Sequence, residues 1–179
     1  MKIEEITKEG FIKVAITQQL INKAIERQKA TPINNKYSFL NGKGNFIGFL
    51  GEELYKQVFS EATHSNTTAY DFIHNGEKIE IKSKRRSIPA VGYLDCDLCY
   101  EHYKGDVDKY VCISIHELSN SRDESGNYAY GYILGFLKKE ELDSSKVYKT
   151  LQGSKQGNGI TMKKTCLQIK ASDLTKYEK

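Results

Sequence analysis

The chain has 179 residues, of which 39% are hydrophobic and 28% are charged, and its formal net charge is +4 at pH 7. This length and composition are typical of a globular protein with one core. The mild positive charge excludes a histone-like composition but is compatible with a localised nucleic-acid surface. No apolar run is long enough to span a membrane, and the N-terminus does not resemble a signal peptide. We therefore expect a cytoplasmic protein that is not bound to a membrane.

Apolar residues at spacings of three and four predict a helix over residues 6–29. Ile12, Ile16, Leu20 and Ala24 belong to this stripe. The helix ends before Pro32, because the residue that precedes a proline avoids the α region. Residues 34–44 form a polar loop that leads into the next helix, and this loop is not a phosphate-binding P-loop.

A second helix is predicted over residues 45–60, with a buried stripe that includes Leu50 and Leu54. At about 100° per residue, Glu52 falls at the edge of this stripe and Glu53 falls further round. A carboxylate at the edge can reach a site on a neighbouring sheet, so we favour Glu52 over Glu53 as a ligand of a metal or of its water. The alternative is an ordinary surface glutamate.

The next segment is a β-hairpin that turns at Asn75-Gly76. This dipeptide is the strongest short hairpin signal, because both central residues of a type I′ turn need a positive φ. With a two-residue loop, Phe72 faces Ile79 and Asp71 faces Glu80. A four-residue loop keeps this pairing, whereas a three-residue loop or a bulge shifts it.

The expected pairing places the Asp71 and Glu80 carboxylates together, with Lys82 on the same face. Two carboxylates directly opposite each other repel, and a hairpin selected only for stability would avoid that arrangement. A divalent cation between them would convert the repulsion into a binding site, and Mg²⁺ takes oxygen ligands of this kind. The alternative is a solvated hairpin with a charged face.

A basic run, Lys84-Arg85-Arg86, follows directly. Three cations close to a phosphate-cleaving site would contact the nucleic-acid backbone, which gives affinity without sequence information. Lys84 is the best candidate of the three, because by alternation it continues the face of Glu80 and Lys82. The alternative is a solvated strand end.

Further strands are predicted over residues 108–116, 128–136 and 166–169, with a short helix or turn over 138–142, whereas 87–105 gives no clear pattern. Cys96-x-x-Cys99 followed by His102 leaves a zinc site open, although the second cysteine pair of a zinc ribbon is missing. We expect an α/β (or α+β) fold in which helices pack around a central mixed sheet.

Asp71 followed by Glu80-Ile81-Lys82 resembles the active-site motif of the PD-(D/E)XK nuclease superfamily, with Tyr70 in place of the proline. Gly48-Phe49-Leu50-Gly51-Glu52 resembles the first active-site helix of that superfamily. The basic run, a later Lys138-Lys139-Glu140-Glu141 segment and a closing Ser172-Asp173-Leu174 are similar to its phage and prokaryotic endonucleases. The resemblance spans residues 44–174, so we expect one nuclease domain with residues 1–43 as an N-terminal addition.

The resemblance implies a restriction-endonuclease-like core and Mg²⁺- or Mn²⁺-dependent hydrolysis of phosphodiesters, with DNA as the partner. Asp71 and Glu80 would bind the metal, with Glu52 and the carbonyl of Ile81 assisting, and Lys82 would position the attacking water. It also implies a bacterial cell, or an infected host cell if a phage encodes the protein. Two alternatives stay open: a non-catalytic nucleic-acid-binding or phage regulatory protein, and a dimeric nuclease that selects branched DNA such as junctions.

Overall fold

A computed structural model describes residues 3–30, 45–65, 69–99, 106–118, 127–155, 161–162 and 164–178. The predicted loop over 34–44 lies outside these residues. The zinc alternative depends on the Cys99 side chain and on His102, which are also outside the description, while Cys96 is a buried free thiol.

A mixed β-sheet forms the centre of the molecule, as expected. Over the described residues this large sheet has seven strands in the order β1-β2-β8-β7-β5-β4-β3. Its central pair, β5 with β7, is parallel and its other neighbouring pairs are antiparallel. The strands in chain order are β1 (Ile3–Ile6), β2 (Ile12–Ala15), β3 (Thr63–His64), β4 (Phe72–His74), β5 (Glu77–Arg86), β7 (Lys109–Glu117) and β8 (Tyr128–Lys138).

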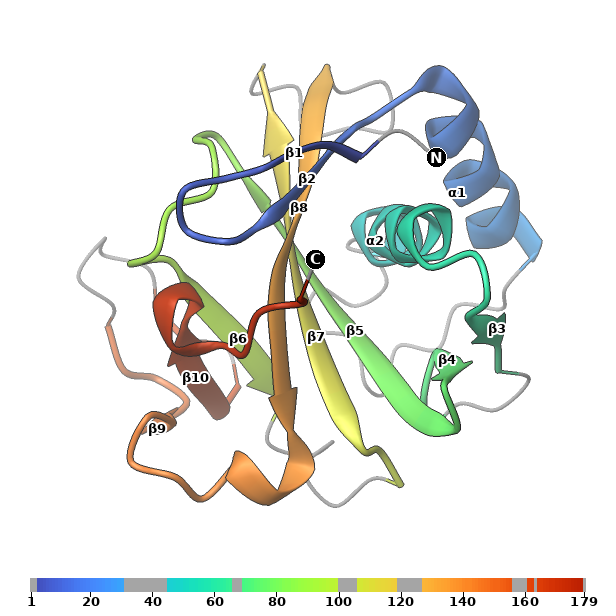
Figure 1. The fold of residues 1–179 in the computed structure, drawn as a ribbon. Coiled ribbons are helices and arrows are strands. Elements are labelled where there is room, and N and C mark those ends of the chain that lie inside the picture. Colours follow the sequence, from blue (N-terminus) through green and yellow to red (C-terminus); the bar gives the residue numbers. More distant parts are fainter. Residues whose placement is uncertain are drawn as a thin grey trace.

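The two faces of the large sheet are covered differently (Figure 1). The helices α1 (Gln18–Ala30) and α2 (Asn45–Val58) lie on one face, with α2 between α1 and the sheet. A small antiparallel sheet in the order β6-β10-β9 lies on the other face; its strands are β6 (Asp95–Cys99), β9 (Tyr148–Thr150) and β10 (Cys166–Lys170). Two 3₁₀ helices, η2 (Lys139–Glu141) and η3 (Ala171–Asp173), follow β8 and β10. The small sheet was not predicted.

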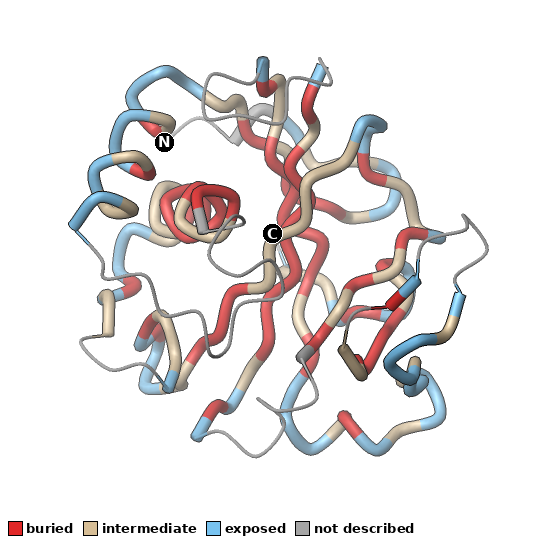
Figure 2. Tube along the Cα trace, turned by 180° about the vertical axis from the view of Figure 1, so that it is seen from behind, coloured by how far each residue is buried: buried red, intermediate tan, exposed pale blue. Residues whose placement is uncertain are grey.

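Two apolar clusters fill the spaces on either side of the large sheet. Leu50, Ile81 and Val111 belong to the cluster beneath the helices, and Leu98, Cys112 and Leu134 belong to the cluster beneath the small sheet. Figure 2 shows the buried residues along the central strands and α2, while exposed residues mark the outer side of α1. The central strands are thus buried on both faces.

Helix α2 approaches β5 very closely at Gly51. A Cβ atom at this position would lie 1.8 Å from Ser83 Oγ and 2.9 Å from Ser83 Cβ. Only glycine fits there, so this residue sets the distance between α2 and β5. The position of Glu52, the next residue, depends on that contact.

The prediction of one helix over residues 6–29 was wrong in its first half. Residues 3–15 form the hairpin β1–β2, which joins the sheet through β8, and α1 begins only at Gln18. Gly10 adopts a φ of +77° at the turn, and Ile12 and Val14 are buried while Lys13 is not. The apolar spacing of this segment fits a period of two as well as a helix, and pairing with β8 decides between them. The N-terminal segment is therefore part of the sheet.

Among the described residues, no helix is both long and apolar enough to cross a membrane.

Candidate active site

The β4–β5 hairpin has the predicted register. His74 pairs with Glu77, Ile73 with Lys78, and Phe72 with Ile79. The turn residues Asn75 and Gly76 have φ values of +52° and +80°, as a two-residue loop of type I′ requires. The local turn signal was therefore sufficient to fix the pairing.

Asp71 lies just before β4, and the regular pairing does not extend to it. Its backbone N–H donates to the carbonyl of Ile79 at 2.9 Å, so Asp71 is not the strand partner of Glu80 that was predicted. Its Oδ2 instead accepts a hydrogen bond from the backbone N–H of Ile81 at 2.7 Å. This contact holds the carboxylate beside the Glu80-Ile81-Lys82 segment, so the two acidic residues remain neighbours by another route.

Glu80 and Lys82 form a close ion pair on β5. Lys82 Nζ donates to Glu80 Oε1 at 2.5 Å, and both side chains are largely buried. Ile81 between them is buried beneath the helices, which places Glu80 and Lys82 on the opposite side of the strand. The expected alternation of the two faces is confirmed.

Glu52 and Glu53 are both buried near the centre of α2, and one arginine of α1 binds both. Arg27 Nη2 donates to Glu52 Oε2 at 2.6 Å, and Arg27 Nη1 donates to Glu53 Oε1 at 3.1 Å. His64 Nε2 lies 3.8 Å from the same oxygen of Glu53. The two glutamates therefore share a cation but differ in their other neighbours.

The charge of Glu52 acts on the hairpin carboxylates. Burial raises the pKa of Asp71 well above its ordinary value, and the charges of Glu80 and Glu52 raise it further, against the effects of Lys82 and the Ile81 N–H. Burial also raises the pKa of Glu52; Arg27 lowers it, and Glu80 and Glu53 raise it. Three carboxyl groups from α2, the start of the hairpin and β5 thus influence one another.

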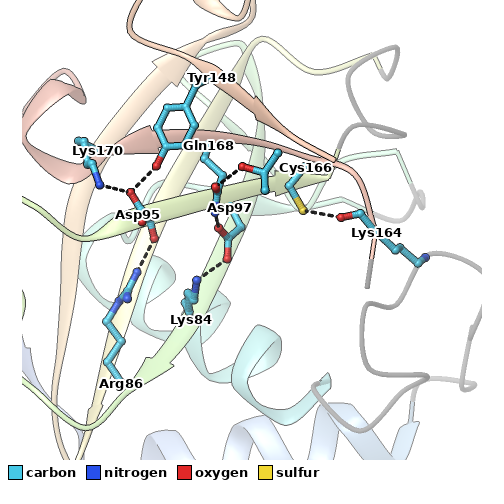
Figure 3. Close-up of polar contacts among 10 residues, drawn as sticks. Lys84, Arg86, Asp95, Asp97, Tyr148, Lys164, Cys166, Gln168 and Lys170 are labelled. Carbon is cyan, nitrogen blue, oxygen red and sulfur yellow. Dashed lines mark hydrogen bonds and ion pairs between the residues drawn. The ribbon is translucent and has the colours of Figure 1, made fainter. Parts of the chain in front are cut away.

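The basic run lies within β5 and its three cations have partners in the protein. Lys84 Nζ donates to Asp97 Oδ2, Arg85 Nε lies 3.6 Å from Glu117 Oε2, and Arg86 Nη2 donates to the backbone carbonyl of Asp95. Figure 3 shows Lys84 and Arg86 reaching the small sheet in this way. Lys84 and Arg86 therefore connect the two sheets, whereas Arg85 pairs within the large sheet, and the exposure of the run to a ligand is limited.

A polar network on the small sheet holds the acidic partners of these cations in place (Figure 3). Gln168 Nε2 donates to Asp97 Oδ1, and Thr150 Oγ1 donates to Gln168 Oε1 at 2.5 Å. Asp95 Oδ1 accepts hydrogen bonds from Tyr148 Oη and Lys170 Nζ, each at 2.5 Å. The sequence contained no signal for this network, because β6, β9 and β10 are distant from one another along the chain.

The carboxyl groups of Asp71, Glu80 and Glu52 fit a hard divalent cation by their chemistry, since Mg²⁺ prefers oxygen donors. Within the described part of the chain, no three Asp, Glu, His or Cys side chains already form a metal-binding cluster. Lys82 donates to one oxygen of Glu80, and Arg27 donates to one oxygen of Glu52. Cation binding through the second oxygen of each carboxylate would keep both ion pairs.

Sequence reasoning did not find two contacts that position the candidate site. Arg27 lies on α1, and its two acidic partners lie 25 and 26 residues away in the chain. Tyr55 Oη lies 2.6 Å from His74 Nδ1, which fastens the hairpin to α2 inside the core. Both contacts follow from helix packing and carry no local sequence signal.

The candidate site thus combines three acidic groups that influence one another, one lysine and a neighbouring basic run. Such a combination can bind a divalent cation and orient a water molecule against a phosphate ester. No protein-family model and no curated protein matches this chain.

Proposed function

We propose that this protein is a metal-dependent nuclease of the PD-(D/E)XK type that cleaves DNA phosphodiester bonds internally. The proposal rests on the position of the Asp71 carboxyl group. It is held against the Glu80-Ile81-Lys82 segment, and the charges of both Glu80 and Glu52 act on it. Acidic groups from a helix, a hairpin start and a strand are brought together here at a cost in repulsion, which a cation would relieve.

Each residue of the candidate site would have a distinct role. Asp71, Glu80, Glu52 and the carbonyl of Ile81 would hold Mg²⁺ or Mn²⁺, which when bound activates water and neutralises charge that develops on the phosphate. Lys82 Nζ, held by Glu80 at 2.5 Å, would donate a hydrogen bond to the attacking water or to a phosphate oxygen. Its partial burial favours this role, because a hydrogen bond to a charged group is stronger where water is excluded.

Lys84 is the member of the basic run that supports a contact with the DNA backbone best. Its side chain keeps 40% of its exposure, whereas that of Arg85 keeps 29%. A phosphate group would have to compete with Asp97 for Lys84. Arg86 contributes chiefly to the contact between the sheets, whereas Arg85 pairs with Glu117 within the large sheet and adds to the positive potential nearby.

Cleavage of supercoiled plasmid and of single-stranded DNA with Mg²⁺, with Mn²⁺ and with EDTA tests the proposal. We expect metal-dependent cutting that Lys82→Ala reduces by about 10²–10³-fold, the usual effect of removing a donor that stabilises the transition state. Lys78→Ala is the matched control, because Lys78 lies on the same strand but pairs with the exposed Asp106.

Cutting that survives Lys82→Ala would contradict the assigned site. Binding of DNA without any metal-dependent cutting would favour the second possibility, a nucleic-acid-binding protein without turnover.

A further inference from the structure

Arg27 occupies an unusual position for a charged residue on an outer helix. It reaches from the last turn of α1 to two consecutive acidic residues on α2, at 2.6 Å to Glu52 Oε2 and 3.1 Å to Glu53 Oε1. Its guanidinium group also lies 5.1 Å from the centre of the Phe49 ring. Glu52 and Glu53 keep only 9% and 7% of their exposure, so these contacts lie mainly inside the protein.

The planar guanidinium group is what allows one cation to serve two carboxylates. Its donors point in fixed directions, so binding Glu53 through Nη1 determines where Nη2 meets Glu52. A lysine at this position would keep the charge but would not fix both groups. Arg27 thereby ties the Glu52 carboxylate to a second, buried anchor.

The contact also involves one Glu52 oxygen, Oε2. A carboxylate ligand can bind a metal or its water through one oxygen while the other accepts a hydrogen bond from the protein. Such hydrogen bonds orient metal ligands, and their loss commonly weakens metal binding about 10–100-fold. We propose that Arg27 is a positioning residue that orients Glu52 toward the metal, with Glu53 as its anchor; this inference rests on the proposed nuclease function.

Mn²⁺ binding to the whole protein without DNA, measured by calorimetry, tests this role directly. We expect Arg27→Gln to weaken Mn²⁺ binding about 10–100-fold. Arg27→Lys should give an intermediate loss of affinity, because it keeps the charge and loses the planar group that binds both carboxylates. The matched control is Lys23→Gln, which removes a charge from an exposed position one turn earlier on the same helix.

Activity measured against Mn²⁺ concentration supplies a second readout. For Arg27→Lys the half-saturating Mn²⁺ concentration should rise, while the rate at saturating Mn²⁺ should approach that of the wild type. A residue needed only for folding would lower thermal stability without changing the Mn²⁺ affinity of the folded protein. If Arg27→Gln does not fold, the Arg27→Lys titration decides.

The outcomes separate this inference from the function on which it rests. Metal-dependent cutting by the wild type, with equal or tighter Mn²⁺ binding in folded Arg27→Gln or Arg27→Lys, would overturn the positioning role alone. A wild-type protein that neither binds Mn²⁺ nor cuts DNA would overturn both. Equal weakening of Mn²⁺ binding in Lys23→Gln would mean that the loss comes from the change in net charge, and it would also overturn the positioning role of Arg27.

Discussion

The Asp71 carboxylate replaces a backbone group at the end of the β4–β5 hairpin. Regular strand pairing ends at Phe72, and the Ile81 N–H finds its acceptor in Asp71 Oδ2 at 2.7 Å. The side chain therefore has a structural role beside its proposed metal role. Substitutions of Asp71 will change both, so Glu80 and Lys82 give clearer information about the chemistry.

Glu80 and Lys82 should behave differently when each is replaced. Glu80→Gln removes a proposed metal ligand and the ion pair with Lys82, so Mn²⁺ binding and cutting should both be lost. Lys82→Ala removes the proposed donor to water and its ion pair with Glu80 Oε1, so cutting should fall while Mn²⁺ binding is retained. Calorimetry with Mn²⁺ beside plasmid cleavage measures the two effects. Equal loss of metal binding in both variants would contradict this division of roles.

At the scale of elements, the spacing of α2 and β5 depends on Gly51. Gly51→Ala would place a Cβ atom 1.8 Å from Ser83 Oγ, and the helix or the strand would have to shift. We expect a loss of about 1–3 kcal/mol in the free energy of unfolding, as is usual for overpacking. Cutting should fall as well, because Glu52 moves with the helix.

Gly48→Ala is the matched control for Gly51→Ala. A Cβ atom at Gly48 meets nothing within 4 Å, and alanine favours the helix over glycine by up to about 1 kcal/mol. Chemical denaturation of both variants measures the difference. If Gly51→Ala proved as stable as Gly48→Ala, the close contact would not constrain the helix.

The joint between β5 and the small sheet yields a prediction for DNA binding. Asp97→Asn removes the charge that pairs with Lys84 but can keep the hydrogen bond from Gln168 to Oδ1. We expect tighter DNA binding, and a plot of log K against log salt that is steeper by about 0.9, which corresponds to one additional phosphate contact.

Asp95→Asn is the control on the same strand, because its side chain binds Tyr148 and Lys170, whereas Arg86 bonds to its backbone. Fluorescence anisotropy at several salt concentrations measures the slope. An unchanged slope in Asp97→Asn would mean that Lys84 does not contact the DNA backbone.

The sequence predicted elements where the signal was local. The Asn75-Gly76 turn and the alternation of β5 fixed a register that the structure confirms. The sequence-based prediction failed where residues distant in the chain decide the structure. Ile12 and Val14 also fit a helix pattern, and pairing with β8 makes them a strand. Strand β9 is short and forms only by pairing with β10 at the edge of the small sheet. The helix position favoured Glu52 over Glu53, but both carboxylates are buried, so burial does not distinguish them. Neither their shared contact with Arg27 nor the internal pairing of the basic run could be foreseen.

At the scale of the whole molecule, the large sheet separates two different environments. The helices cover one face and contribute Glu52, while the small sheet covers the other and supplies Asp97 as the ion-pair partner of Lys84. Strand β7 of the parallel pair between them is buried on both sides, whereas β5 is buried only at Ile79, Glu80 and Ile81. The candidate site lies at the β4–β5 hairpin, beside this pair. Its acidic groups are partly desolvated there, and their protonation is therefore coupled to folding.

This coupling predicts how stability depends on pH and on metal. Asp71 and Glu52 have raised pKa values in the folded protein, so they bind protons more tightly when folded than when unfolded. Their contribution to stability is therefore complete below the unfolded pKa of about 4 and is lost as pH rises through the folded pKa. Glu61 and Asp106 have lowered pKa values, and their contribution changes in the opposite direction.

Comparison of EDTA with Mg²⁺ isolates the site from these other groups, because Glu61 and Asp106 contribute equally in both. Mg²⁺ binds the deprotonated carboxylates, so its stabilisation should grow as pH rises and reach about 2.7 kcal/mol at a hundred times its dissociation constant. Denaturant unfolding from pH 4.5 to 8 measures both curves. Asp71→Asn should bring the two curves closer together, because it removes one titrating ligand. Parallel curves for the wild type would mean that the carboxyl groups of this site do not bind the metal.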